Sequence, residues 1–217
     1  VAVTDIDEFD VSTPTDSDST ADTVAENAAD DTAVGVTGSA SDADGGTNTI
    51  TWTMTSGTTA CDDFFDIGSS DGIVRVDGTS EMDYETVTSC DITVTATSAD
   101  TSTATSATIS VAITDIDEFD VSTPTDSDTT ADTVAENAAD NAAVGVTGSA
   151  SDADGGTNTI TWTMTSGTTA CDDFFDIGSS DGIVRVDGTS EMDYETVTSC
   201  DITVTATSAD LSTATSA

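Results

Sequence analysis

The sequence predicts an all-β protein built from tandem antiparallel Greek-key β-sandwiches, two in number and of about seven strands each. Three observations lead to this fold class. The chain repeats itself with an offset of 110 residues, its apolar residues alternate with polar ones in short segments, and clusters of Gly, Asp and Ser separate these segments. Helical periodicity is missing, so each repeat has the length and the pattern of one sandwich.

The repeat sets the domain organisation. Residues 1–107 match residues 111–217 with five differences, which indicates a recently duplicated array. The differing pairs are Val3/Ile113, Ser19/Thr129, Asp31/Asn141, Thr32/Ala142 and Thr101/Leu211. We therefore expect the end of a preceding repeat or linker at 1–9, repeat 1 at 10–114, a linker at 115–119, and repeat 2 at 120–217 without its last strand.

The strands of the first repeat follow from alternation with period two. In 48–54, Ile50, Trp52 and Met54 share one face and threonines the other, as expected of a strand with one buried face. The same reasoning places seven strands near Val24 and at Val34–Val36, Asn48–Met54, Phe64–Ile67, Ile73–Val76, Ile92–Thr97 and Thr108–Thr114. The polar segments around Pro14 and Pro124 lack this periodicity and are interpreted as extended junctions.

The composition excludes several classes of function. There are 43 acidic residues against two basic ones, giving a formal net charge of −41. Such a surface repels nucleic acids and anionic membranes and attracts cations, although adaptation to a salty habitat or solubility alone would also produce acidity. No stretch approaches the roughly 20 apolar residues that span a bilayer. The chain has no His to act as the base of a catalytic triad and no Lys to supply the amine of a Schiff base. We therefore do not expect an enzyme.

Four cysteines form two equivalent pairs. Cys61 and Cys90 lie in the first repeat, and Cys171 and Cys200 lie at the same positions of the second. Their wide spacing and the absence of His argue against zinc. We expect one disulfide within each repeat, which indicates an oxidising, extracellular setting on a cell surface or in a secreted fibre.

Four groups of acidic residues recur in each repeat. They are Glu26-Asn27, Asp42-Ala43-Asp44-Gly45-Gly46-Thr47-Asn48, Met82-Asp83-Tyr84-Glu85 and Asp115-Ile116-Asp117-Glu118. Calcium takes six to eight oxygen ligands, and Asp-x-Asp followed by Gly lets a loop turn several oxygens inward. Each group alone could be a solvated acidic loop. Their recurrence in both repeats favours Ca²⁺ binding at the ends of the sandwiches.

In this order, the groups resemble the cadherin repeat, especially the bacterial cadherin-like domains of large extracellular adhesins and surface proteins. Ala40, Asp42, Asp44, Gly46 and Asn48 match its Ala-x-Asp-x-Asp-x-Gly-x-Asn pattern. The segment 82–85 is similar to its Leu-Asp-Tyr/Arg-Glu motif, and 115–119 to its Asp-x-Asn-Asp-Asn linker. The resemblance covers essentially each whole repeat and implies a cadherin/immunoglobulin-like sandwich with calcium between successive repeats.

The resemblance also implies a ligand set. At the complete junction it comprises Glu26, Asp83 and Glu85, then Asp115, Asp117 and Glu118 with the backbone carbonyls of Ile116 and Phe119, then Asp152, Asp154 and Asn158. Two half junctions would comprise Asp5, Asp7, Glu8, Asp42, Asp44 and Asn48 at one end, and Glu136, Asp193 and Glu195 at the other. The family's Val-x-Ala-x-Asp motif ends here in Ser98 and Ser208, so that ligand is lost or replaced by Ser or by nearby Asp210.

Two non-enzymatic functions remain. In the first, a calcium-rigidified module forms the stalk or adhesion segment of a surface protein and contacts neighbouring repeats and a cell-surface or matrix ligand. In the second, the repeats are the structural subunit of an extracellular filament or surface layer, joined by strand exchange between identical chains. Outward Thr-x-Thr rows could also bind ice or carbohydrate, but Thr is favoured on outward strand positions without such a role.

Overall fold

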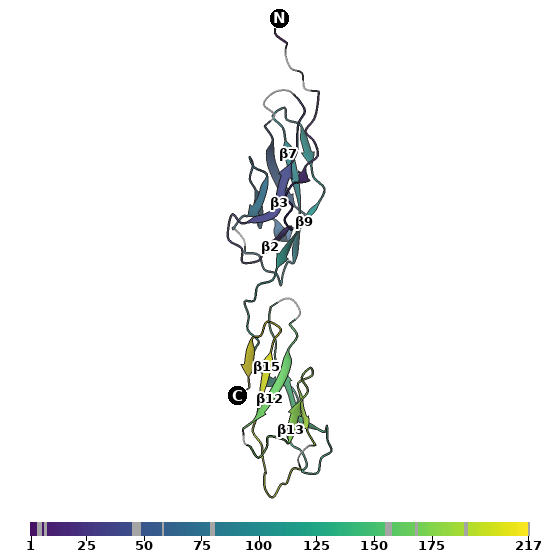
Figure 1. The fold of residues 1–217 in the computed structure, drawn as a ribbon, viewed down its shortest axis with the longest axis vertical. Helices are drawn as coiled ribbons and strands as arrows, with labels where there is room; N and C mark the ends of the chain where they lie inside the picture. Colours follow the sequence, from purple (N-terminus) through teal and green to yellow (C-terminus); the bar gives the residue numbers. More distant parts are fainter. Residues whose placement is uncertain are drawn as a thin grey trace. The chain divides into compact units, whose positions relative to one another are not determined.

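The computed structural model describes residues 1–217 except 4–5, 7, 45–48, 58, 79–80, 155–157, 168, 189–190 and 217. The chain divides into two compact units, Val1–Ile116 and Asp117–Ala217, so the boundary falls inside the expected linker 115–119. Figure 1 shows that each unit is built from strands, and the described residues contain a single short 3-10 helix, η1, at Thr59–Cys61. The all-β fold class is confirmed.

The first sheet of the first unit has four strands in the order β1-β3-β6-β5. These are β1 (Thr15–Asp16), β3 (Ala33–Ser39), β6 (Ile73–Val76) and β5 (Phe65–Ile67), and all their pairings are antiparallel. The register of β3 against β6 shifts at Gly35, where φ is +87° and an added Cβ would lie 2.3 Å from the Ala21 carbonyl oxygen. Only glycine tolerates this bulge.

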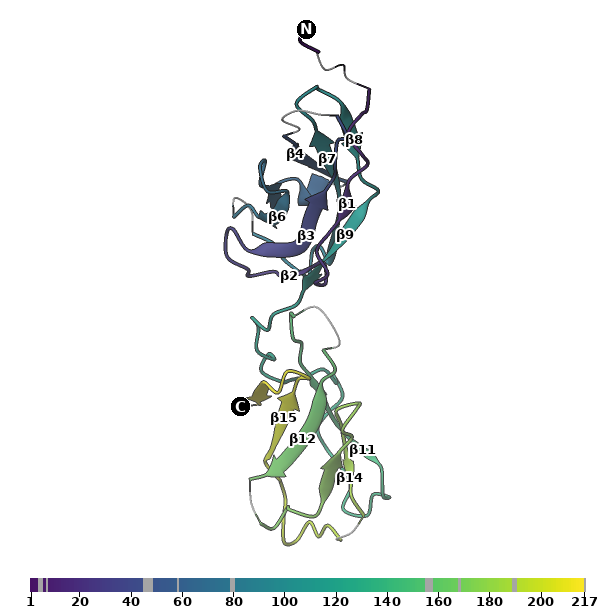
Figure 2. The ribbon, with the colours of Figure 1, turned by 45° about the horizontal axis from the view of Figure 1, so that its top comes forward.

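The second sheet runs in the order β2-β9-β7-β4. Its strands are β2 (Thr23–Ala25), β9 (Ile109–Thr114), β7 (Ser89–Thr97) and β4 (Thr51–Ser56), and β8 (Thr103–Thr105) pairs with β7 beyond the end of β9. β2 and β9 lie side by side in parallel, unlike the other pairs (Figure 2). The strand β9 therefore closes the sheet between β7 and β2.

The core of the first unit lies between these two sheets. Along β7, Ile92, Val94 and Ala96 are buried while the intervening threonines are less buried, so the alternation predicted from sequence is confirmed. Trp52 is 7% exposed and packs so closely on Gly38 that a Cβ there would lie 2.7 Å from its ring. The small residue thus makes room for the large one.

Two features differ from the sequence-based expectation. The segment around Pro14, interpreted as a junction without strand character, contains β1, and β8 is a further strand. Strands of two or three residues carry too few side chains to show a period. The strand β1 is recognised instead by its contacts, because Asp16 Oδ1 accepts hydrogen bonds from the Thr37 and Asp18 N–H groups, both at 2.9 Å.

The second unit repeats the first with fewer strands. Among its described residues, 133–135, which corresponds to β2 in the sequence, is not paired. The buried hydrophobic cluster has 7 described members against 17 in the first unit. The sheets run β10-β11-β14-β13 and β12-β15-β16. The strands are Thr125–Asp126, Ala143–Ser149, Thr161–Ser166, Phe175–Ile177, Ile183–Val186, Ile202–Thr207 and Thr213–Thr215, numbered β10 to β16 in chain order.

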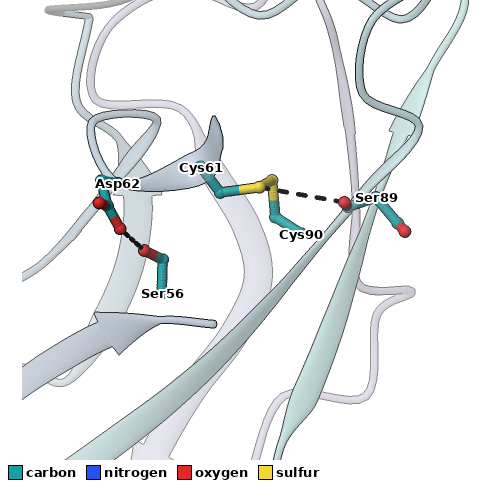
Figure 3. Close-up of a disulfide and its surroundings, with 5 residues drawn as sticks. All are labelled: Ser56, Cys61, Asp62, Ser89 and Cys90. Carbon is teal, nitrogen blue, oxygen red and sulfur yellow. Dashed lines mark hydrogen bonds between the residues drawn. A yellow bond between two sulfur atoms is a disulfide. The ribbon is translucent and has the colours of Figure 1, made fainter. Parts of the chain in front are cut away.

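Both expected disulfides are confirmed. Cys61 at the end of η1 is bonded to Cys90 in β7, and Cys171 is bonded to Cys200, each across a separation of 29 residues. Figure 3 shows the first bond beside the Ser89 carbonyl, with the Ser56 hydroxyl donating to the Asp62 carboxylate nearby. The first disulfide thus fastens η1 to β7, an inner strand of the second sheet.

Candidate metal sites

Three carboxylates converge at the end of the first unit where the chain enters. Asp42 and Asp44 follow β3, and Asp100 lies in the turn between β7 and β8. One oxygen of each lies within 4.8 Å of the other two. The turns hold them in place, because Asp42 Oδ1 accepts from the Asp44 N–H at 3.0 Å and Asp100 Oδ1 from the Ser102 N–H at 2.7 Å. Carboxylates so close together attract a hard cation.

The incoming segment is fastened to this cluster through its backbone. Asp44 accepts from the N–H groups of Glu8 and Phe9, at 3.1 and 2.9 Å. Val11 N–H donates to Ser102 Oγ at 3.0 Å, next to Asp100. The same loops thus gather the carboxylates and set the path of residues 8–11.

The second unit has a related cluster at the corresponding end. Asp154 and Asp210 correspond to Asp44 and Asp100, and the linker residue Asp117 joins them. Asp117, Asp154 and Asp210 meet within 4.8 Å, and Asp154 is 7% exposed. Asp154 accepts from the Glu118 and Phe119 N–H groups at 3.1 Å each. The pKa of Asp117 is raised from its ordinary value, first by loss of hydration and then by the charges of Asp210 and Asp154. These carboxylates repel one another unless a cation lies between them.

A second acidic group occupies the far end of the first unit. Glu26, at the end of β2, is 6% exposed and accepts two backbone hydrogen bonds, from Tyr84 at 2.6 Å and from Ile116 at 2.8 Å. Asp83 accepts from the Thr86 hydroxyl at 2.7 Å, which lowers the Asp83 pKa. Glu85 and Asp115 are exposed neighbours of these contacts. Glu26 thus positions both the 82–85 turn and the start of the linker.

In the second unit, the corresponding group is more open. Glu136, Asp193 and Glu195 lie within 4.8 Å of one another and all three are exposed. Glu136 accepts a single backbone hydrogen bond, from Tyr194 at 2.8 Å. This group has the same residue types as its counterpart in the first unit, Glu26, Asp83 and Glu85.

The two basic side chains lie elsewhere. Arg75 pairs with Asp71 at 2.7 Å and Arg185 pairs with Asp181 at 2.6 Å. Each arginine is thus committed to a carboxylate outside the acidic clusters, and the chain has no third Lys or Arg. The clusters must take their positive charge from solution.

The structure describes most of the ligand residues that were predicted from the sequence. Most of them belong to the groups above; in addition, Asp152 Oδ1 accepts from the Asp154 N–H at 3.1 Å, and Asn158 is half-buried. Asp5, Asp7 and Asn48 lie outside the described residues. Sequence reasoning missed Asp100 and named Asp210 only as a substitute for Ser208. The signal was available, since each Asp lies two residues after the buried serine in a short turn.

No family model matches the chain, and no curated protein matches its sequence. Solved structures do match it. Protocadherin Gamma B2 extracellular cadherin domains 3-6 align over 99% of this chain and 52% of their own, with a TM-score of 0.76 and 20% identity. Mouse Cadherin-23 EC22-24 aligns over 98% and 64%, with a TM-score of 0.67 and 20% identity.

Drosophila N-cadherin EC1-4 aligns over 89% of this chain and 46% of its own length, with a TM-score of 0.63 and 22% identity. The chain thus spans about half to two thirds of these structures. Among the described residues, no helix is long and apolar enough to cross a membrane. At this level of identity the comparison concerns the fold, and each unit has the fold of a cadherin extracellular domain.

Proposed function

We propose that the chain is a calcium-binding, non-catalytic repeat module that serves extracellularly as a stalk or adhesion segment of a surface protein. The observation that carries the proposal is the convergence of carboxylates at the ends of both units, as in Asp117, Asp154 and Asp210. Clusters of oxygen ligands of this kind suit Ca²⁺ rather than zinc or a transition metal. The disulfides and the cadherin-domain fold support an extracellular location.

The linker is the segment through which calcium would act. Its first half is hydrogen-bonded to the first unit through Ile116 and Glu26, and its second half to the second unit through Phe119 and Asp154. Asp115, Asp117 and Glu118 therefore leave an anchored backbone on either side of the unit boundary. In the proposal, calcium ions bind these three carboxylates together with ligands from both units, and so stiffen the junction.

The complete ligand set combines the sequence-based assignment with Asp210. It comprises Glu26, Asp83, Glu85, Asp115, Asp117, Glu118, Asp152, Asp154, Asn158 and Asp210, with the backbone carbonyls of Ile116 and Phe119. Asp210 takes the role that the family motif gives to an Asp at the position of Ser208. Without bound cations, repulsion among the carboxylates disfavours the closed junction, and this repulsion weakens with added salt.

Small-angle scattering of the 217-residue chain tests the proposal. With calcium, we expect a narrow distribution of dimensions, and with excess chelator a broad one typical of two units that move independently. Asp154→Asn should give the broad distribution even with calcium. Asp44→Asn is the matched control, because it makes the same change in the same local turn but away from the linker at 115–119.

The possible results of the scattering experiment lead to different conclusions. Identical scattering with calcium and with chelator would refute calcium rigidification. An equal effect of both substitutions would place any bound ion away from the linker. Isothermal titration calorimetry of the same variants should show loss of the junction ions in Asp154→Asn alone, with monovalent salt held constant.

A further inference from the structure

The second sheet of the first unit ends in a strand whose outer edge is open. The strand β4 pairs with β7 on one side, with Thr53 opposite Thr95 and Met54 opposite Val94. In the order β2-β9-β7-β4, no further strand follows it among the described residues. The arrangement recurs in the second unit, where β12 has the same sequence and pairs with β15 among the described strands. An open edge presents backbone donors and acceptors to any chain that approaches it.

The hydrogen bonds at the end of β4 show which of its backbone groups point outward. Gly57 N–H donates to the Asp91 carbonyl at 2.7 Å, and in an antiparallel ladder every second residue bonds to the same neighbour. The odd-numbered residues of β4 therefore bond to β7, and its even-numbered residues face away. Trp52 N–H is taken by the Ser69 carbonyl at 3.1 Å. Within the described part of the chain, the N–H and C=O groups of Met54 have no hydrogen-bond partner.

The strand β4 also lacks the features that keep edge strands apart. Natural edge strands are commonly short, or carry charges, prolines or bulges. The other edge strands described in the first unit, β1, β2, β5 and β8, have two or three residues each, whereas β4 has six. Its sequence, Thr-Trp-Thr-Met-Thr-Ser, has no charged residue in a chain with 43 acidic ones, and its register with β7 has no bulge. The edge is thus long, regular and uncharged.

The partner that fits this edge is the same strand of another molecule. A two-fold axis beside Met54 places two copies of β4 antiparallel, so that each Met54 N–H donates to the Met54 carbonyl of the other copy. On the outer face, Thr53 then lies opposite Thr55 of the other copy, as Thr55 lies opposite Thr93 within the unit. The Thr55 and Thr93 hydroxyl oxygens are 2.8 Å apart, so threonine pairs of this kind form hydrogen bonds in this sheet.

The distribution of charge favours the same contact. Two chains of net charge −41 repel one another, and like charges brought together in an interface oppose association. The outward side chains of β7 in register with β4 are also uncharged, namely Thr93, Thr95 and Thr97. A carboxylate meets β4 at its end, where Asp62 accepts from the Ser56 hydroxyl. Two copies therefore approach with little local repulsion when they meet edge to edge at this strand.

We propose that the edge formed by β4 in the first unit and by β12 in the second pairs antiparallel with the same edge of a second copy of this chain. The contact joins the same surface on both copies, so it is isologous, and two sheets become one continuous sheet. Met54 and its counterpart Met164 supply the central hydrogen bonds. Because the contact uses no carboxylate, it goes beyond the proposed calcium binding and is independent of it.

Sedimentation velocity of the 217-residue chain in chelator, over a concentration series, tests the edge pairing without calcium. We expect reversible association that strengthens between about 0.15 M and about 1 M NaCl, because the screening length falls from about 8 Å to about 3 Å. A variant with Thr53→Glu, Thr55→Glu, Thr163→Glu and Thr165→Glu should raise the dissociation constant at least about tenfold. The reason is that each new charge lies opposite another across the contact.

The matched control carries Thr103→Glu, Thr105→Glu, Thr213→Glu and Thr215→Glu. It adds the same charge at exposed threonines of β8 and β16, which β7 and β15 separate from the edge. This variant should associate nearly as well as the unaltered chain, and circular dichroism checks that both variants are folded. Equal weakening in the two variants, or an unaltered chain that stays monomeric at high salt, would overturn the proposal.

Amide hydrogen exchange, followed by NMR on the unaltered chain, measures the backbone pairing directly. Exchange at Met54 and Met164 should slow as the associated fraction rises with protein concentration. Exchange at Thr53, which bonds to β7 in the monomer, should change little. Association that leaves Met54 exchange unaltered would show that the copies meet through another surface, and the edge assignment would be wrong.

Discussion

Replacing Glu26 by Gln measures how much its carboxylate stabilises the contacts to the 82–85 turn and to the linker. Its buried carboxylate accepts N–H bonds from both Tyr84 and Ile116, one on each oxygen. Glu26→Gln preserves size but leaves a single carbonyl oxygen for two donors. Glu136, in the second unit, is exposed and accepts only the Tyr194 N–H, so Glu136→Gln keeps an acceptor for its single donor.

The expected magnitudes differ accordingly. A half-buried N–H that loses its acceptor costs about 1–3 kcal/mol, so Glu26→Gln should lower the free energy of unfolding by about 2 kcal/mol. Glu136→Gln should change it by no more than about 0.5 kcal/mol, as exposed substitutions usually do. Both variants remove one negative charge from a chain of net charge −41, so the general relief of repulsion cancels in the comparison.

Urea unfolding in chelator, followed by tryptophan fluorescence, measures the two effects separately. Trp52 reports on the first unit in a Trp162→Phe background, and Trp162 reports on the second in a Trp52→Phe background. Each Gln variant is compared with its own single-tryptophan parent. With a urea slope of about 1–3 kcal/mol per molar, the midpoint for Glu26→Gln should fall by about 1 M. Equal shifts in the two units would refute the two-donor role of Glu26.

Three further predictions concern the first unit. Replacing Cys61 and Cys90 by Ala should lower its free energy of unfolding by about 3–4 kcal/mol, because the disulfide closes a loop of 29 residues and so restricts the unfolded chain. The same urea assay measures this loss, and an unchanged midpoint would contradict it. Hydrogen bonds from arginine lower the pKa of Asp71, so its contribution is present above the ordinary Asp pKa and is lost as pH falls through the lowered value. Asp71→Asn should therefore destabilise at neutral pH, and the difference from the parent should vanish in acid melts. Thr101 has a φ of +81°, unfavourable for a β-branched residue, so Thr101→Gly should raise the thermal midpoint whereas Thr103→Gly, within β8, should lower it.

The regular parts of the fold could be predicted from local patterns. The alternation around Trp52 and along Ile92–Thr97 identified β4 and β7, because a half-buried strand must place every second side chain in the core. The equivalence of the cysteine pairs identified both disulfides. By contrast, β1 and the parallel pairing of β2 with β9 depend on distant partners, and two or three residues cannot show a period.

The candidate sites divide in the same way. Recurring Asp and Glu groups indicated which loops carry ligands, since spacing and Gly content are local properties of the chain. The meeting of Asp100 with Asp42 and Asp44 joins loops that lie more than 50 residues apart in the sequence, and no local pattern specifies that distance. The two-donor contact of Glu26 likewise arises only when the chain brings 84 and 116 to the end of β2.

By itself, the sequence determined the duplication, the strand-forming segments, the charge and the residue types that could bind a cation. Each of these follows from composition or from the order of near neighbours. The tertiary structure alone decided which carboxylates meet, and it placed β9 between β7 and β2 in the first unit. Both depend on closing long loops into two packed sheets, because the partners of each contact are distant in the chain and are brought together by burial of a shared core.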